Sequence, residues 1–89
     1  MLYRIYTEDK NRQIVEQILD ENFPGYTIIQ ADGRWKGQSE KSLIIEVITS
    51  NDFDFSQRIK DVAAKIVKAN SQESCYITST VQDETLFFV

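Results

Sequence analysis

The order of the hydrophobic patterns along the chain restricts its fold more than any other feature. Four segments have strand-like patterns: the first and fourth place their side chains alternately on two sides, the second is rich in β-branched residues, and the third is apolar on both faces except for Glu46. Two further segments carry apolar stripes at helical spacing. The strand-like segments are residues 2–7, 26–31, 42–49 and 73–81. One helical stripe lies between the first two strands and the other between the last two, which predicts the order β-α-β-β-α-β.

This order is typical of an α+β, ferredoxin-like fold. Right-handed crossovers place the first and third strands in the centre of a four-stranded antiparallel sheet, with both helices on one face. Residues 85–89 are expected to form a short C-terminal strand or a docked tail. The 89 residues make a single domain, residues 1–89, small enough that oligomerisation would add stability.

Both predicted helices have candidate N-caps and a continuous apolar stripe. Residues 8–11 offer several capping side chains for the first helix, and Asp54 or Ser56 is expected to cap the second. The predicted stripes are Ile14, Val15, Ile18 and Leu19 in the first helix, and Phe55, Ile59, Val62, Ala63, Ile66 and Val67 in the second.

The composition disfavours several classes of function. The chain has no His and a single Cys, Cys75, so ordinary triad chemistry, zinc sites and an intrachain disulfide are not expected. The net charge of −4 opposes binding to a nucleic acid polymer. The N-terminus lacks the apolar run of a signal peptide and no segment approaches a membrane-spanning length, so we expect a cytoplasmic protein. We expect it to hold no metal or cofactor.

The strand alternation also predicts an unusually apolar open face of the sheet. If the odd-numbered residues of the first and third strands face the helices, the opposite face carries Leu2, Arg4, Tyr6, Ile44, Glu46 and Ile48. A solvated face would be more polar, so we expect a homo-oligomer, a dimer or trimer, with Leu2, Ile44, Glu46 and Ile48 at its interface. On this face Arg4 and Glu46 could form an ion pair that sets the register.

The segment 32–41, expected to be a loop, concentrates side chains suited to recognition. It holds the only Trp of the chain, two of the three Gly residues and three cations. Trp35 could stack on a ligand ring, or it could fold back and close the end of the sheet. The predicted ligand site is a cleft between subunits lined by Arg34, Trp35, Lys36 and Lys41, with Arg4 or Tyr6 contributing from the sheet.

No convergent catalytic set is evident in the sequence. Glu40 and Glu46 could form a pair for acid–base chemistry, but pairing with Lys41 and Arg4 is the expected structural role. Cys75 is expected to be a buried small hydrophobe, because no His is present to activate it. Residues 72–74 are expected to be a plain polar loop.

Several short segments resemble those of a family of small, uncharacterised bacterial and phage proteins. The segments are Phe23-Pro24-Gly25-Tyr26-Thr27, Gly33-Arg34-Trp35, Glu40-Lys41-Ser42 and Gln72-Glu73-Ser74. The resemblance implies a ferredoxin-like fold and no established activity. More loosely, the architecture is similar to that of the PII-like signalling proteins, which are trimers that bind nucleotides in clefts between subunits.

Together, these observations lead to the hypothesis of a non-enzymatic oligomer that binds a small anionic ligand, a nucleotide or cyclic nucleotide. Its role would be that of a sensor, or of a phage-encoded sponge that sequesters an immune signal. The alternative is a protein-interaction module that binds a host protein through the apolar sheet face. An enzyme of the dimeric α+β barrel type is disfavoured because the chain lacks His and a paired acid and base.

Overall fold

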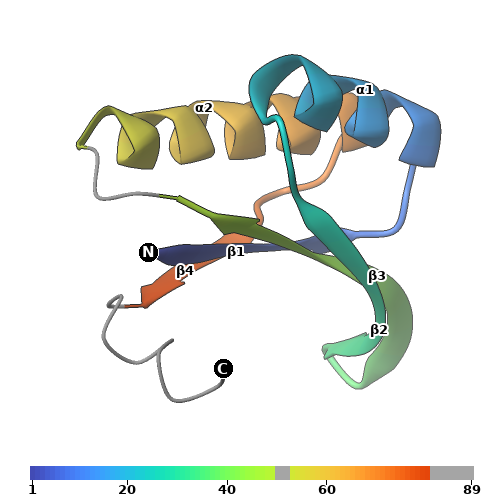
Figure 1. Ribbon diagram of the computed structural model, residues 1–89. Helices are drawn as coiled ribbons and strands as arrows, with labels where there is room; N and C mark the ends of the chain where they lie inside the picture. The colour runs from blue at the N-terminus through green and yellow to red at the C-terminus, as the bar shows by residue number, and fades with distance from the viewer. Residues whose placement is uncertain (50–52, 81–89) are drawn as a thin grey trace.

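The computed structural model describes residues 1–49 and 53–80, which form a four-stranded sheet and two helices that cover one of its faces (Figure 1). In chain order the elements are β1 (Leu2–Glu8), α1 (Arg12–Asn22), β2 (Thr27–Trp35), β3 (Gln38–Ile48), α2 (Phe53–Asn70) and β4 (Tyr76–Thr80). The expected strand or tail at residues 85–89 lies outside the described residues.

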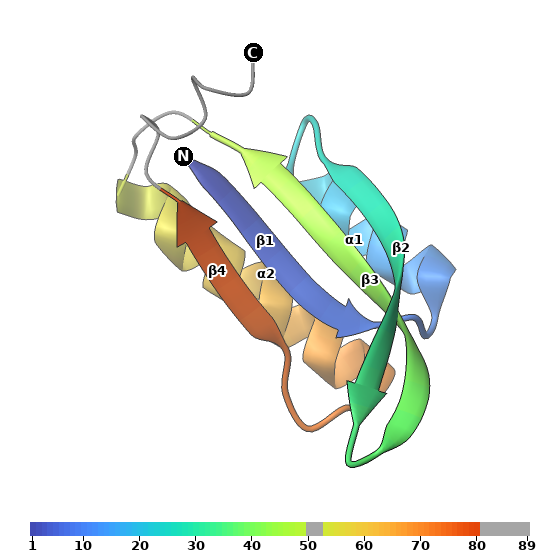
Figure 2. The ribbon, with the colours of Figure 1, turned by 90° about the horizontal axis from the view of Figure 1, so that it is seen from below.

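The sheet has the predicted topology. Each pair of neighbouring strands is antiparallel, and the order across the sheet is β2-β3-β1-β4. Figure 2, which looks onto the open face, shows β1 and β3 in the centre with both helices behind them. The predicted α+β, ferredoxin-like fold is therefore confirmed.

The hydrophobic core lies between the sheet and the helices. The central strands contribute Tyr3, Ile5, Leu43, Ile45 and Val47, all buried and all on the face predicted from the alternation. The helices contribute Val15, Leu19, Ile59, Val62, Ala63 and Ile66. Burial of these side chains is the main favourable contribution to the stability of the domain.

In each helix, one residue of the predicted apolar stripe is less buried than expected. Ile14 is 47% exposed, because α1 presents only Val15 and Leu19 fully to the sheet. Phe55 is half-buried and closes one end of the core, where its ring stacks on Tyr3 and Phe23 at centroid distances of 6.1 and 5.6 Å.

The helix ends are held by contacts between the helices rather than by the predicted caps. Asn11, the residue before α1, has a φ of 48° and makes no side-chain capping bond. Its side-chain amide instead donates to the carbonyl oxygen of Ala69 at 3.0 Å, near the end of α2. Helix α2 begins at Phe53, so neither Asp54 nor Ser56 lies in the N-cap position that we predicted. It ends at Asn70, as expected.

The segment 32–41 is a hairpin and not the predicted loop. Strand β2 continues to Trp35 and β3 begins at Gln38, so only Lys36 and Gly37 form the turn. Their φ angles of 51° and 77° are those of the left-handed turns that suit the twist of two-residue hairpins. The hairpin curls away from the helices and back beneath the open face (Figure 1).

Gly33 lies where this curl brings the two strands of the hairpin close together. A Cβ atom at this position would lie 2.6 Å from the Ser42 Oγ atom, which is well inside van der Waals contact. A residue without a side chain therefore permits the close approach. The segment 72–75, between α2 and β4, passes opposite the hairpin and shortens β4 relative to the predicted strand at 73–81.

Candidate functional site

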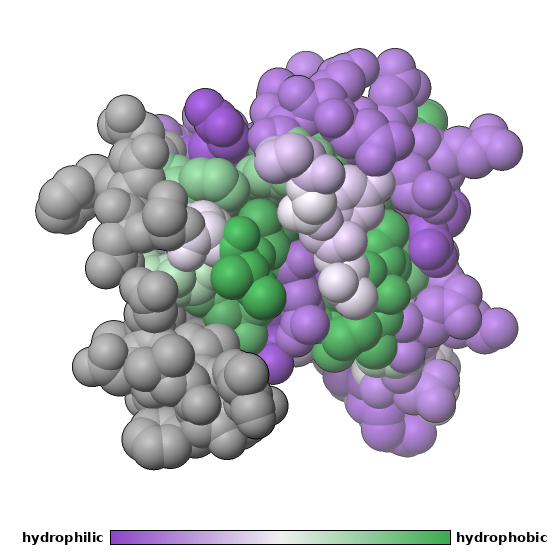
Figure 3. Space-filling model, viewed as in Figure 1, coloured by the Kyte–Doolittle hydropathy of each residue, from purple (hydrophilic) through white to green (hydrophobic). Residues whose placement is uncertain are grey.

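The curled hairpin encloses a hollow of about 670 Å³ on the open face of the sheet. Three parts of the chain form its walls: the end of β1, the β2–β3 hairpin and the segment that connects α2 to β4. The lining residues on these parts include Tyr6, Glu8, Lys10, Asp32, Gly33, Trp35, Glu40, Ser42, Ile44, Gln72, Glu73 and Tyr76. In the space-filling view, polar side chains cover the helices and the hairpin tip, and apolar ones gather between them, over the sheet (Figure 3). The hollow is large enough for a nucleoside-sized ligand.

Carboxylates outnumber cations around this hollow. Its lining includes four acidic residues, Glu8, Asp32, Glu40 and Glu73, and a single basic one, Lys10. Lys10 is already engaged, because its Nζ atom lies 3.6 Å from the Glu8 carboxylate. The electrostatic potential in the hollow therefore favours a cation over a phosphate group.

Glu40 is the least satisfied of these carboxylates. Its side chain is half-buried, and it forms no ion pair or hydrogen bond with any other side chain in residues 1–49 and 53–80. The expected pairing with Lys41 is therefore wrong, since successive residues of a strand point to opposite faces of the sheet. Glu40 is left facing the hollow without a counter-ion.

Aromatic rings supply the apolar part of the lining. Tyr6 and Tyr76 lie on neighbouring strands with ring centroids 6.0 Å apart and an interplanar angle of 60°. Trp35 projects from the tip of the hairpin and is 59% exposed, so the ring is not part of the core. The structure thus brings two of the predicted ligand-site residues, Tyr6 and Trp35, to the same hollow.

The four predicted cations do not line the hollow. Arg34 stabilises the hairpin turn by donating hydrogen bonds to the Ser39 hydroxyl at 3.0 Å and to the Gly37 carbonyl oxygen at 2.8 Å. Lys36 places its Nζ atom 5.7 Å from the centroid of the Trp35 ring. Lys41 is exposed on β3.

The fourth cation, Arg4, forms the predicted ion pair on the open face. Its Nε atom donates to a carboxylate oxygen of Glu46 at 2.7 Å, across the β1–β3 register. The hydrogen bond to Glu46 raises the pKa of the Arg4 guanidinium. Neither residue lines the hollow, so this pair stabilises the register and does not compensate the Glu40 carboxylate.

A network of polar side chains supports the wall formed by residues 71–75. The Thr7 hydroxyl and the Asn70 amide both donate to the side-chain oxygen of Gln72 at 3.0 Å, and the Gln72 amide donates to the Ser74 carbonyl at 2.8 Å. Residues 72–74, predicted to be a plain loop, are therefore fixed against the sheet. Burial raises the pKa of the neighbouring Cys75 thiol, although the residue is half-buried and not fully buried as predicted.

The predicted interface residues lie together on the open face. Leu2 pairs with Ile48 in the register, and Ile44 lies farther along β3 with Glu46 between them. Ile48 is 75% exposed, while the other three are half-buried. Their common face is as predicted, and self-association remains a prediction.

Sequence reasoning missed the acidic lining and Tyr76. Strand alternation alone could have placed Glu8, Glu40 and Tyr76 on the open face, but the curl that gathers them into a hollow has no periodic signal. In the described part of the chain, no group of three or more Cys, Asp or Glu side chains is arranged to hold a metal ion. Neither helix is long and apolar enough to cross a membrane.

Among known proteins, this chain matches solved structures and no family model or curated sequence. No family model matches the sequence, and no curated protein matches it. Seventeen chains of solved structures match, and one of them is a phage SAM lyase in its apo state. That structure aligns with a TM-score of 0.68 and 17% sequence identity, over 85% of this chain and 75% of the lyase chain.

This comparison corrects one expectation. The absence of His led us to expect that the chain is not an enzyme, yet a protein with the same fold is a lyase. The expectation is overturned because a lyase of this fold shows that the scaffold supports catalysis. At 17% identity the likeness itself shows the fold alone.

Proposed function

We propose that this chain is a lyase that acts on a small sulfonium nucleoside of the SAM class, bound in the hollow beneath the sheet. The observation that carries the proposal is the half-buried Glu40 carboxylate, which has no counter-ion among the described residues and lines the same hollow as Trp35 and Tyr6. A sulfonium cation is attracted both by a carboxylate and by aromatic faces. The similar fold of a phage SAM lyase supports the same class of substrate.

The acidic lining of the hollow favours a sulfonium nucleoside over the nucleotides that the sequence suggested. A nucleotide would bring phosphate groups next to four acidic residues, and within residues 1–49 and 53–80 Lys10 is the one cation in the lining. A sulfonium nucleoside offers a similar ring for stacking and carries no phosphate. The proposed role is therefore consumption of a sulfonium nucleoside, in place of the sequestration of a phosphorylated signal.

The proposed chemistry does not require His. When a carbon–sulfur bond of a sulfonium breaks, its electron pair stays on sulfur, which becomes a neutral thioether and needs no proton to leave. The carbon fragment is completed without water by ring closure: its own carboxylate oxygen forms a bond to the carbon as the carbon–sulfur bond breaks, so no proton is transferred. The protein's part is to hold the cation, exclude water and orient the fragment, which suits carboxylates and aromatic rings.

Incubation of the purified protein with SAM tests this proposal. Liquid chromatography with mass spectrometry should show loss of SAM and the appearance of a neutral thioether nucleoside, in amounts exceeding the protein. Glu40→Gln should lower kcat/KM about tenfold or more, because it removes a charged contact worth roughly 1.5–3 kcal/mol.

Glu21→Gln is the matched control, because it removes the same charge from an exposed position on α1, a helix on the far face of the sheet. Its activity should match that of the wild type. Stable SAM in the presence of wild-type protein, with and without added Mg²⁺, would refute the proposed activity. Equal losses in both variants would refute the role of Glu40.

A further inference from the structure

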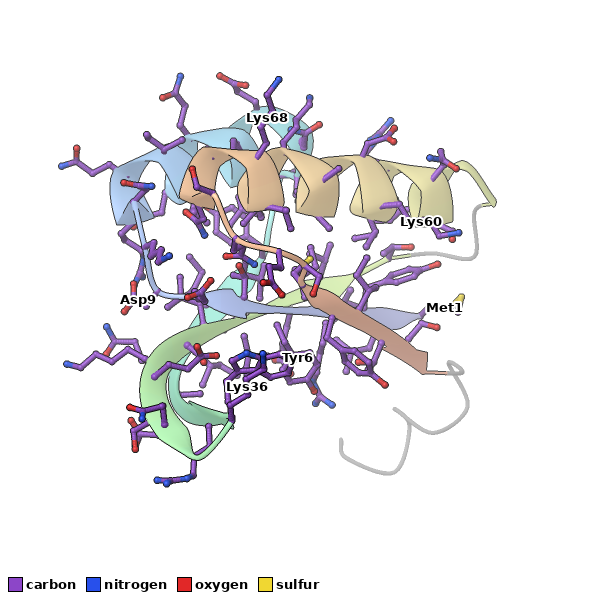
Figure 4. All side chains as sticks on the ribbon, turned by 180° about the vertical axis from the view of Figure 1, so that it is seen from behind. Met1, Tyr6, Asp9, Lys36, Lys60 and Lys68 are labelled. Atoms are coloured by element: carbon purple, nitrogen blue, oxygen red, sulfur yellow. The ribbon has the colours of Figure 1, made fainter. Side chains whose placement is uncertain are left out.

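The ammonium group of Lys36 lies over the ring of Trp35, the only Trp of the chain. The Lys36 Nζ atom lies 5.7 Å from the Trp35 ring centroid, within the range of a cation–π contact. Trp35 lines the hollow, and among the described residues Lys36 is not part of that lining. In Figure 4, Lys36 extends from the hairpin turn into the space beneath the sheet, on the side where Tyr6 lies.

The backbone around this contact is braced by hydrogen bonds, whereas the Lys36 side chain is exposed. The Lys36-Gly37 turn has left-handed φ angles at both residues, and two hydrogen bonds from Arg34 brace it. Lys36 itself is exposed and forms no ion pair within the described residues. An exposed cation–π contact is worth about 0.5–1 kcal/mol, so its ammonium can leave the ring at small cost.

We propose that Trp35 is the cation-recognition ring of the hollow and that Lys36 is a resident competitor for it. A sulfonium ligand takes the place of the Lys36 ammonium on the ring, and the lysine moves into solvent. The ligand class rests on the proposed function, whereas the competition rests on the observed contact. Removal of Lys36 therefore strengthens the binding of a cation, which is opposite to the effect expected if Lys36 contacted a phosphate.

This arrangement distinguishes a substrate from its product by charge. A sulfonium gains the ring face and the attraction of the Glu40 carboxylate, which together offset the loss of the Lys36 contact. A neutral thioether gains neither, so Lys36 returns to the ring when the charge is lost. Lys36 thus weakens the binding of the cation and leaves the binding of the neutral thioether unchanged, whereas Trp35 and Glu40 provide the preference for the charged ligand.

Binding measurements with two probes test the proposal. Sinefungin carries an ammonium where SAM carries its sulfonium and cannot be cleaved at that position, and S-adenosylhomocysteine is the neutral thioether counterpart. In isothermal titration calorimetry, Lys36→Met should lower the Kd of sinefungin about threefold and leave that of S-adenosylhomocysteine unchanged. In a Trp35→Leu background the effect of Lys36→Met should disappear.

Lys41→Met is the matched control, because Lys41 is an exposed hairpin lysine that does not line the hollow. An equal gain from Lys41→Met and Lys36→Met, or no gain from Lys36→Met, would overturn the competition while leaving the lyase proposal standing. A selective gain from Lys36→Met without any cleavage of SAM would support the cation site and refute the lyase. If no variant bound either probe, both proposals would fail.

Discussion

The effect of Gly33→Ala on the free energy of unfolding should depend on the residue at position 42. We expect it to destabilise the wild-type protein and to stabilise a Ser42→Ala variant. In the wild-type background the new methyl group would lie 2.6 Å from the Ser42 Oγ atom, about 0.8 Å inside ordinary contact. Moving Ser42 to another rotamer or shifting the hairpin is expected to cost about 1–3 kcal/mol. Alanine also restricts the unfolded chain more than glycine does, which offsets about 0.4–1 kcal/mol of this cost. We therefore expect a net loss of stability of about 1 kcal/mol.

Ser42→Ala removes the oxygen and leaves the strand otherwise unchanged. In the described residues the Ser42 hydroxyl makes no hydrogen bond, so this substitution alone should be nearly neutral. The φ of Gly33 is outside the left-handed region, which means that alanine can adopt it without backbone strain. Gly33→Ala in this background should therefore stabilise the domain by about 0.4–1 kcal/mol.

Urea unfolding of the four proteins of this double-mutant cycle measures the effect. We expect a coupling free energy of about 1–2 kcal/mol between the two positions, with equal m-values in all four proteins. The corresponding Tm of Gly33→Ala should fall by about 4–8 °C in the wild-type background. If Gly33→Ala destabilises both backgrounds equally, the contact with Ser42 is not the reason for glycine at this position.

Three further predictions follow from single positions. Gly37→Ala should destabilise the domain by about 1 kcal/mol in urea unfolding, because φ is 77° there although the added methyl group would meet no atom within 4 Å. Alkylation of Cys75 by iodoacetamide at pH 8 should be slower than that of a free cysteine, since burial raises its pKa and lowers its thiolate fraction; equal rates in the native protein and in urea would contradict this. Sedimentation should give a mass above that of one chain, and Ile48→Lys should lower it, because Ile48 exposes 75% of its surface on an apolar sheet face. A wild-type monomer at micromolar concentration would refute the predicted self-association.

The fold could be predicted because the strongest patterns coincide with the core. The apolar and β-branched runs around Ile5 and Ile45 identify both central strands, and these two residues are buried and pair directly in the sheet. The stripe in α2 identifies the helix that covers them. Buried strands keep such patterns because a shift of the pairing register by one residue would turn all of their core-facing side chains toward the other face.

The hairpin could not be predicted in the same way because its two strands are polar on both faces. Residues 32–41 show no alternation of hydrophobicity, and their pairing depends on the turn at Lys36-Gly37. Two local signals point to it: the glycine in the second turn position and the opposite charges of Asp32 and Lys41, which pair across the strands. Neither signal predicts the curl of the hairpin.

The nature of the site depends on which face of the hairpin each charge occupies. Read along the chain, Arg34 and Lys36 make the segment around Trp35 basic, and this led to the hypothesis of an anionic ligand. In the hairpin, Arg34 is used to brace the turn, whereas Glu40 lies across the strands from Gly33 and faces the hollow. Of the two cations next to Trp35 in sequence, Arg34 braces the turn and Lys36 lies over the ring, and neither lines the hollow. Among the described residues the charged lining of the hollow is mostly acidic, so it favours a ligand of the opposite sign.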